Sequence, residues 1–157
     1  MATSEILGKF PAEVEPACTL TSISNGAGRI CAVIDNSTTR CRRGILAVKA
    51  KTGTSPTVNT IFKWYLIRQS NGTSNVKGGG GTLGDADAAV SAEPVNAPIV
   101  GVIVVTATSN VEYNELFIVD EPGEKFSFVF WNATGVTSHG TAPTPTIQWT
   151  PILDESQ

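Results

Sequence analysis

The side chains that could support hydrolysis are few and scattered along the sequence. The only histidine is His139, in a Ser-His-Gly-Thr stretch among prolines. A hydrolase needs a nucleophile with a base within reach, and a lone loop histidine is far more often a surface residue than a general base. Asp120, Glu121 and Glu124 could supply the carboxylate pair of a glycosidase, but all three fall at one expected turn and face no cleft. The sequence therefore predicts that the chain is not an enzyme.

The cysteines form no recognisable metal or redox motif. Cys18, Cys31 and Cys41 are odd in number, and none belongs to a Cys-x-x-Cys pair of the kind that holds zinc. We expect buried small apolar residues or free thiols, because a cytoplasm keeps thiols reduced. Cys31 and Cys41 flank an expected turn, so a bridge between those two is sterically possible, but a reducing compartment argues against it.

The most irregular stretch, Ser70–Ala89, holds residue types that bind phosphate or calcium in other proteins. Its four consecutive glycines, Gly78–Gly81, are followed by Thr-Leu-Gly and not by the Lys-Ser/Thr of a phosphate-binding loop. Asp85 and Asp87, with Glu93, lack the remaining oxygen ligands of a known calcium loop. We interpret the stretch as a flexible surface loop, and we expect neither a metal nor a cofactor.

The chain has one cluster of basic residues: Arg40, Arg42 and Arg43, followed by Lys49 and Lys51. Nucleic-acid binding is not favoured, because no aromatic stacking residues are interleaved with these charges and the formal net charge is −3. Two interpretations stay open. The cluster is either a solvated loop and strand start, or a set of salt bridges to an acidic partner subunit, in which case the three arginines are partner contacts.

Length and composition indicate one globular domain that associates with others. The 157 residues suffice for a full core, with 41% hydrophobic residues and only 16% charged residues, against about a quarter in a typical domain. Low surface charge favours association. No basic region followed by an apolar run marks a signal peptide, and no apolar stretch approaches the ~20 residues that cross a bilayer. We therefore expect a soluble chain made in a cytoplasm, with no membrane partner.

The segment Lys125–Asn132 is the strand around which the other elements must be arranged. Phe126, Phe128 and Phe130 recur at every second residue, so their rings point to the same face of a strand. Ser127, Val129 and Trp131 point to the other face, which we also expect to be covered. This alternation predicts a central strand with the Phe row in the core of a β-sandwich.

The remaining sequence predicts further short strands and no helix. They are expected at Ala17–Ile23, Arg29–Asp35, Arg43–Lys51, Val58–Gln69, Ala97–Thr108, Val111–Asp120 and Thr146–Leu153. The nearly continuous apolar run of Ala97–Thr108 predicts burial on both faces. Many short strands joined by turns are typical of an all-β, antiparallel β-sandwich, and we expect a jelly roll.

Residues 1–16 are predicted to form an extended N-terminal arm outside a single domain, residues 17–157. Pro11 would break a helix, and the apolar residues Ile6, Leu7 and Phe10 are too sparse for an amphipathic helix. The arm is either a frayed terminus or a segment whose apolar residues dock on a neighbouring subunit. The second interpretation makes Ile6, Leu7 and Phe10 partner contacts.

Several stretches together resemble decoration, or cement, proteins of tailed phages. In Arg29–Ala50, Ala-Val-Ile-Asp-Asn-Ser-Thr-Thr leads into Gly-Ile-Leu-Ala-Val-Lys-Ala. The run Lys63–Arg68, Lys-Trp-Tyr-Leu-Ile-Arg, precedes Gln-Ser-Asn-Gly-Thr, and Phe128–Gly135 precedes a closing Ile-Gln-Trp strand. The likeness spans most of residues 29–152 and leaves out the arm and the four glycines.

The resemblance implies a β-sandwich on the capsid surface of a virion, made in the host cytoplasm. Such proteins are often trimeric and sit where major capsid protein subunits meet, so the implied partners are the major capsid protein and two further copies in a homotrimer. The implied role is to stabilise the shell against the pressure of packaged DNA.

Two other functions remain alternatives. A carbohydrate-binding fibre or baseplate module would stack sugar rings on exposed aromatic residues, with Trp64, Tyr65, Trp131 and Trp149 as candidates. A tail or neck structural protein would assemble into a ring. A hydrolase that uses His139 is the least favoured possibility.

Overall fold

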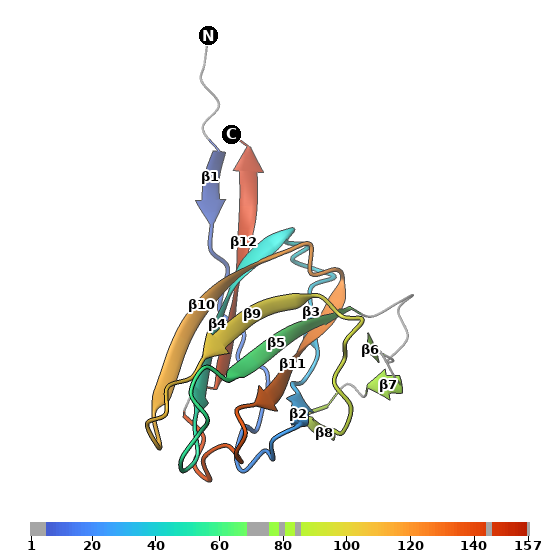
Figure 1. The fold of residues 1–157 in the computed structure, drawn as a ribbon. Helices are drawn as coiled ribbons and strands as arrows, with labels where there is room; N and C mark the ends of the chain where they lie inside the picture. The colour runs from blue at the N-terminus through green and yellow to red at the C-terminus, as the bar shows by residue number, and fades with distance from the viewer. Residues whose placement is uncertain (1–5, 69–75, 79–80, 84–85, 144–145, 157) are drawn as a thin grey trace.

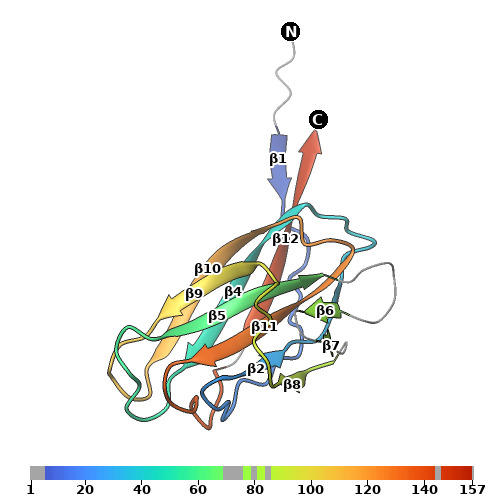
Figure 2. The same ribbon diagram turned by 45° about the vertical axis from the view of Figure 1, so that its right-hand side comes forward.

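The computed structural model describes residues 6–68, 76–78, 81–83, 86–143 and 146–156. They form two antiparallel sheets packed face to face and a separate hairpin of β6 (Val76–Gly78) and β7 (Gly81–Leu83) (Figures 1 and 2). The first sheet has the order β1 (Ile6–Lys9), β12 (Ile147–Ser156), β4 (Arg43–Lys51) and β10 (Glu112–Asp120). The second has the order β8 (Ala88–Val90), β2 (Ala27–Ile30), β11 (Lys125–Ala133), β5 (Ile61–Arg68) and β9 (Ile99–Val104), and β3 (Ile34–Asp35) also pairs with β11. The predicted β-sandwich is confirmed, whereas this order does not confirm a jelly roll.

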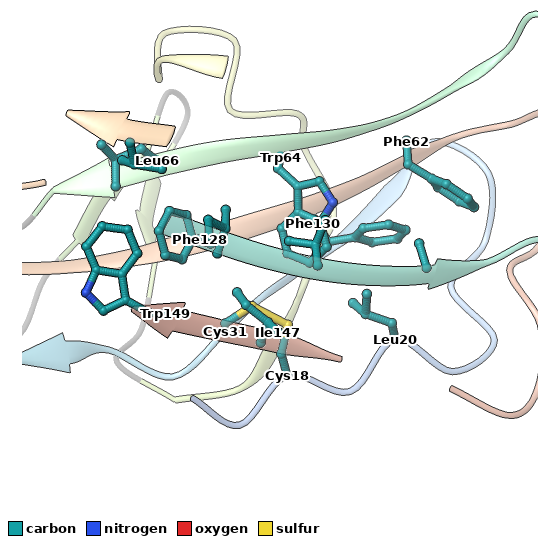
Figure 3. Close-up of a cluster of buried hydrophobic side chains, with 14 of the residues drawn as sticks. Cys18, Leu20, Cys31, Phe62, Trp64, Leu66, Phe128, Phe130, Ile147 and Trp149 are labelled. Atoms are coloured by element: carbon teal, nitrogen blue, oxygen red, sulfur yellow. A yellow bond between two sulfur atoms is a disulfide. The ribbon is translucent and has the colours of Figure 1, made fainter. Parts of the chain in front are cut away.

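The core lies between the sheets and is built on β11, as predicted. Phe126, Phe128 and Phe130 are each 0% exposed. The ring of Phe126 lies 5.1 Å from the Trp149 ring of β12, in an edge-to-face arrangement that aromatic pairs prefer. Figure 3 shows Phe128, Phe130 and Trp64 gathered in this cluster beside Trp149. The Phe row therefore joins the two sheets.

The opposite face of β11 is covered as well. The cover is the segment between β8 and β9, and not a third sheet. Val129 and Trp131 are buried in a second cluster that includes Tyr65 and Val90. Lys63 Nζ lies 2.6 Å from Glu93 Oε1, and the Tyr65 hydroxyl donates to the same oxygen. Burial, and then this bond to Glu93, raises the pKa of Tyr65. Glu93 thus fastens the segment between β8 and β9 over the outer face of the second sheet.

The prediction of a strand at Ala17–Ile23 is wrong, although the segment contributes to the core. Leu20 and Ile23 are buried, but Ser22 has a positive φ of 52°, which interrupts an extended strand. The backbone groups of Ile23 bond to β11 and to the loop after it: its amide donates to Ser138 Oγ at 2.8 Å, and its carbonyl accepts from Asn132 Nδ2, near the end of β11, at 2.8 Å. The predicted strand Arg29–Asp35 is likewise divided, into β2 and β3.

Burial of the Ala97–Thr108 run on both faces is also contradicted. Its strand, β9, lies at the edge of the second sheet. Ile103 and Val105 face the core, but Ile99, Val102 and Val104 are 52%, 42% and 58% exposed. Alternation leaves the outer face of an edge strand in contact with water when nothing covers it.

The expectation of three free cysteines is wrong for two of them. Cys18 and Cys31 form a disulfide, with Cα atoms 4.4 Å apart (Figure 3). Cys41 is free. The bridge joins the segment before β2 to the residue after it, and both cysteines belong to the core. Cys31 therefore pairs with Cys18, and the bridge to Cys41 that the turn would sterically allow is not formed.

Among the described residues, no helix is long and apolar enough to cross a membrane.

Candidate partner-binding site

One end of the sandwich carries a projecting two-stranded ribbon. β12 pairs with β4 only as far as Ile152, which lies opposite Arg43, the first residue of β4. The residues Leu153–Ser156 continue beyond the sheet and pair only with β1, from Lys9 to Ile6. Figure 1 shows this ribbon, β1 with the end of β12, rising from the body of the molecule. An isolated pair of strands is marginally stable in water, so the ribbon is an element that a partner could stabilise.

A pocket opens at the same end of the sandwich. It has a volume of about 590 Å³, and its lining comes from the loop before β4, the end of β5 and the turn between β10 and β11. We call it the arginine pocket. Its residues are Asn36, Arg40, Cys41, Arg42, Arg68, Glu121, Gly123 and Glu124.

A buried asparagine fixes the shape of the arginine pocket. Asn36 Nδ2 donates to the Cys41 carbonyl at 3.0 Å and to the Gly123 carbonyl at 2.8 Å. Its Oδ1 accepts from the Cys41 amide at 3.1 Å and from Cys41 Sγ at 3.0 Å. Burial raises the pKa of the Cys41 thiol, so the floor of the pocket stays neutral. One side chain thus joins two loops that are distant in the sequence.

The exposed rim of the arginine pocket carries three guanidinium groups. Arg42 Nη2 lies 3.0 Å from Glu121 Oε1, and these side chains are 80% and 72% exposed. Such an exposed pair contributes little and can be exchanged for another. Arg68 Nε donates to the Glu121 carbonyl at 2.8 Å, and Arg40 Nε donates to the Ser37 carbonyl at 3.1 Å. Both guanidinium groups are thereby held in place, and a planar guanidinium suits a carboxylate.

Two residues on the rim have strained backbones. Arg40 and Glu121 both have a φ of 48°, a region that side-chain-bearing residues other than Asn and Asp rarely adopt. Strain of this kind costs about 1–3 kcal/mol and persists where the surroundings enforce it, often at binding sites. Positive φ angles also occur away from the pocket, at Ser22, Ser55, Asn59 and Asn110, so they do not by themselves mark a site.

The structure brings the elements that carry the predicted contact residues to one end of the molecule. Arg40 and Arg42 line the arginine pocket, and Arg43 begins β4. Ile6 and Leu7 lie on β1 in the ribbon, and Phe10, which follows it, is 61% exposed. Whether a partner contacts these residues stays a prediction.

Of the residues that line the pocket, the sequence linked only Arg40 and Arg42, and it did not join the charged residues Arg68 and Glu121 to them. Arg68 was placed at the end of a strand, and Glu121 at a turn, without a link between them or to the basic cluster. The sequence holds one weak indication of their location. Arg68 and Glu121 each follow a stretch of alternating apolar residues, at a position where a strand is expected to meet a loop. Arg68 and Glu121 lie beside the basic cluster because the strand order brings their strands to the same end of the sandwich. The strand order cannot be derived from a single sequence.

The groups considered for catalysis lie at two places. Glu121 and Glu124 both line the arginine pocket, so the expectation that they face no cleft is wrong, whereas His139 lies in a different loop. His139 Nδ1 accepts from the Thr141 amide at 3.0 Å. The adjacent Ser138 hydroxyl is buried, accepting from the Ile23 amide and donating to the Leu20 carbonyl, so it is not directed at the histidine. Within the described part of the chain, no group of three or more His, Cys, Asp or Glu residues is arranged to hold a metal ion.

The carboxylates considered for calcium serve separate ion pairs. Asp87 Oδ1 lies 2.5 Å from Arg29 Nε, and Glu93 lies beside Lys63. Asp85 and the centre of the four-glycine run lie outside the described residues.

The aromatic residues considered for sugar stacking are enclosed. Trp64, Tyr65, Trp131 and Trp149 are at most 6% exposed. They belong to the two hydrophobic clusters on either side of β11 and β5. The exposed aromatic strip that a carbohydrate-binding module would use is therefore not made of these residues.

Comparison with known proteins identifies no relative, since no family model, no curated protein and no solved structure matches this chain.

Proposed function

We propose that this chain is a structural protein of a tailed-phage virion, a decoration protein that binds the major capsid protein where subunits of the shell meet. The observation that carries the proposal is the joint location of the ribbon and the arginine pocket at one end of the sandwich. The resemblance of most of residues 29–152 to decoration proteins suggests that the partner is the major capsid protein.

The chemistry of this end suits an acidic protein surface. The pocket carries three arginines against two glutamates, a formal excess of one positive charge, on a chain whose net charge is −3. Carboxylates of the partner would replace Glu121 at Arg42 and bind the guanidinium groups of Arg40 and Arg68. The exposed Phe10 would provide apolar contact beside them. A stable joint of this kind buries about 1,000 Å² or more in total.

Such a contact would act mechanically. A protomer that binds across a joint loses its buried contacts when the shell expands, so expansion under DNA pressure becomes less favourable. Anything that binds only the intact state stabilises it by mass action.

Undecorated capsids incubated with the purified protein provide the test. The wild-type chain should co-sediment with them and raise the temperature at which they burst. A variant carrying Arg40→Glu and Arg42→Glu should bind at least about tenfold more weakly, a loss of ~1.4 kcal/mol. Lys51→Glu is the control, because it reverses a charge at the other end of β4, about 26 Å away at the usual rise of a strand.

The outcomes separate the function from the site. If the wild-type chain neither binds nor changes the bursting temperature, the proposed capsid function is wrong. If it binds and the arginine variant binds equally well, the function stands but the arginine pocket is not the contact.

A further inference from the structure

The outer strand of the first sheet, β10, presents exposed aliphatic residues at the edge of the sheet. Among the described residues, β10 has a single neighbour, β4, and its other side ends the sheet. Leu116 and Ile118 on this strand are 70% and 71% exposed. Both views place β10 along one flank of the sandwich (Figures 1 and 2). A long edge strand with exposed aliphatic residues is a template for pairing with another chain.

The backbone of β10 alternates between its neighbour and the open edge. The Glu121 amide donates to the Arg42 carbonyl at 2.5 Å, and the Thr52 amide donates to the Val111 carbonyl at 3.0 Å. These two pairs continue the β4–β10 register at its ends. Bonded and non-bonded pairs alternate in antiparallel strands, so the odd-numbered residues of β10 bond to β4. The N–H and C=O groups of the even-numbered residues therefore point to the open edge.

Apolar side chains lie on the outer face of the first sheet, next to the open edge of β10. In the β4–β10 register, Ile118 lies opposite Ile45 and Leu116 lies opposite Ala47. These two rows of apolar side chains are adjacent and face water. They continue into a hollow of about 320 Å³ that Ala47 and Leu116 line in part. A polar row lies on either side of these two apolar rows. One consists of Arg43 and Asp120, and the other of Lys49 and Asn114.

We propose that two copies of this chain pair along β10, antiparallel, about a two-fold axis at Phe117. Leu116 then lies opposite Ile118 of the second copy, and even-numbered residues face even-numbered residues, so both open edges exchange hydrogen bonds. Each central row of the joined sheet becomes fully apolar, running from Ile45 and Ile118 of one copy to Leu116 and Ala47 of the other. The two four-stranded sheets become one continuous sheet.

The charges favour this register over its neighbours. With the axis at Phe117, Asp120 lies opposite Asn114 of the second copy, in a row whose ends are Arg43 and Lys49. Moving the axis to Leu116 would place Asp120 opposite Glu112, and like charges in cross-strand positions are destabilising. Moving it to Ile118 would place Leu116 opposite Asp120. Only the axis at Phe117 keeps both apolar rows intact.

One residue limits the strength of the pairing. Glu115 lies opposite Val48 on the core-facing side of β10, yet it is exposed at the edge. An inward-pointing charge on an edge strand opposes strand addition. In the proposed dimer Glu115 would lie opposite Val119 of the second copy. The association is therefore reversible, and removal of this charge should strengthen it.

Sedimentation measured from low to high protein concentration tests the proposal. The wild-type chain should shift from the monomer mass to twice that mass. Leu116→Lys should weaken dimerisation at least tenfold, because it places a charge in both apolar rows, and Glu115→Thr should strengthen it. Val95→Lys is the matched control, since Val95 is also 70% exposed and lies outside β10. A thermal unfolding curve of each variant verifies that it folds.

Cysteine crosslinking tests the register independently. Facing bonded residues have Cα atoms about 5.5 Å apart, within disulfide range. A mixture of Leu116→Cys and Ile118→Cys chains should give a covalent dimer on oxidation, and neither variant should do so alone. A wild-type chain that stays monomeric or forms trimers would overturn the proposal. So would a Leu116→Lys variant that dimerises normally, or Leu116→Cys crosslinking to itself.

Discussion

Gly44 leaves the space that the Trp149 indole occupies in the core. A Cβ atom at this position would lie 2.4 Å from two carbon atoms of the Trp149 ring and 2.7 Å from the Thr150 carbonyl oxygen. The strand β4 is fixed between β10 and β12, so it has little freedom to move away. Trp149 in turn contacts the rings of Phe126 and Phe128. A single methyl group here therefore disturbs the aromatic centre of the molecule.

Gly44→Ala should lower the free energy of unfolding by about 2–3 kcal/mol, because overpacking forces a rigid indole to shift. Chemical denaturation followed by tryptophan fluorescence measures the change. Gly140→Ala is the control. Its Cβ would come no closer than 3.7 Å to any neighbour, so stability should stay the same or rise slightly. Equal effects of the two variants would contradict the packing argument.

Asp87 fastens the segment around β8 to the rest of the sandwich. It accepts from Arg29 Nε at 2.5 Å, Thr19 Oγ1 at 2.6 Å and the Thr19 amide at 3.1 Å. Burial acts to raise the pKa of Asp87, but these bonds outweigh it and hold the pKa below the usual value. The folded pKa is thus lower than the unfolded pKa. The resulting stability is present above the unfolded pKa and is lost as the pH falls through the folded pKa.

Asp87→Asn should cost about 1–2 kcal/mol of stability at neutral pH, a typical value for hydrogen bonds to a charged group. The difference between wild type and variant should shrink as the pH is lowered toward and below the usual pKa of an aspartate, because the wild-type carboxyl becomes protonated. Denaturation curves at several pH values measure this difference. A gap that does not change with pH would show that the charge of Asp87 contributes nothing.

At the level of strands, period-2 alternation was sufficient where the strand lies inside a sheet. Arg43–Lys51 was predicted to the residue, and the Phe row of β11 was correctly assigned to the core. The same reasoning was wrong for Ala17–Ile23, because its backbone bonds go to loop residues such as Ser138. It was also wrong for the outer face of β9. Apolar residues alone do not distinguish a central strand from an edge strand, since strand order decides what covers them.

The candidate site was predicted in part for a similar reason. Arg40 and Arg42 are close in sequence and were recognised as a cluster, and both line the pocket. Arg68 joins them from another strand, through a contact with the Glu121 carbonyl that only the folded sandwich creates. The disulfide was missed because a reducing cytoplasm was expected to keep the thiols free, and because proximity in the sequence suggested Cys31 with Cys41 and not Cys31 with Cys18.

Removal of the disulfide should destabilise the sandwich without unfolding it. A variant with Cys18→Ala and Cys31→Ala should lose roughly 2–3 kcal/mol, about what closing a loop of this length contributes. A reducing agent should destabilise the wild-type chain by a similar amount and leave the variant unchanged. Alkylation of the unfolded, unreduced protein should modify Cys41 alone. Modification of three cysteines would show that the bridge is not formed.

At the level of the whole molecule, the proposed contacts lie on separate surfaces. The arginine pocket and the ribbon occupy one end of the sandwich, whereas β10 runs along its flank. Antiparallel pairing of two β10 strands would direct the two arginine pockets in opposite directions. A dimer could therefore present only one pocket to a given shell surface. Its binding would show no gain from two simultaneous contacts.

The ribbon has a consequence for the connectivity of the chain. Ile6 lies directly opposite Ser156, so the backbone that enters the sandwich and the backbone that leaves it are hydrogen-bonded neighbours. A short turn between them would make residues 6–156 a covalent circle without displacing any strand. Such a circle could be reopened at a surface turn, as circular permutation requires. The order in which the strands are synthesised would then change, while each of their partners would stay the same.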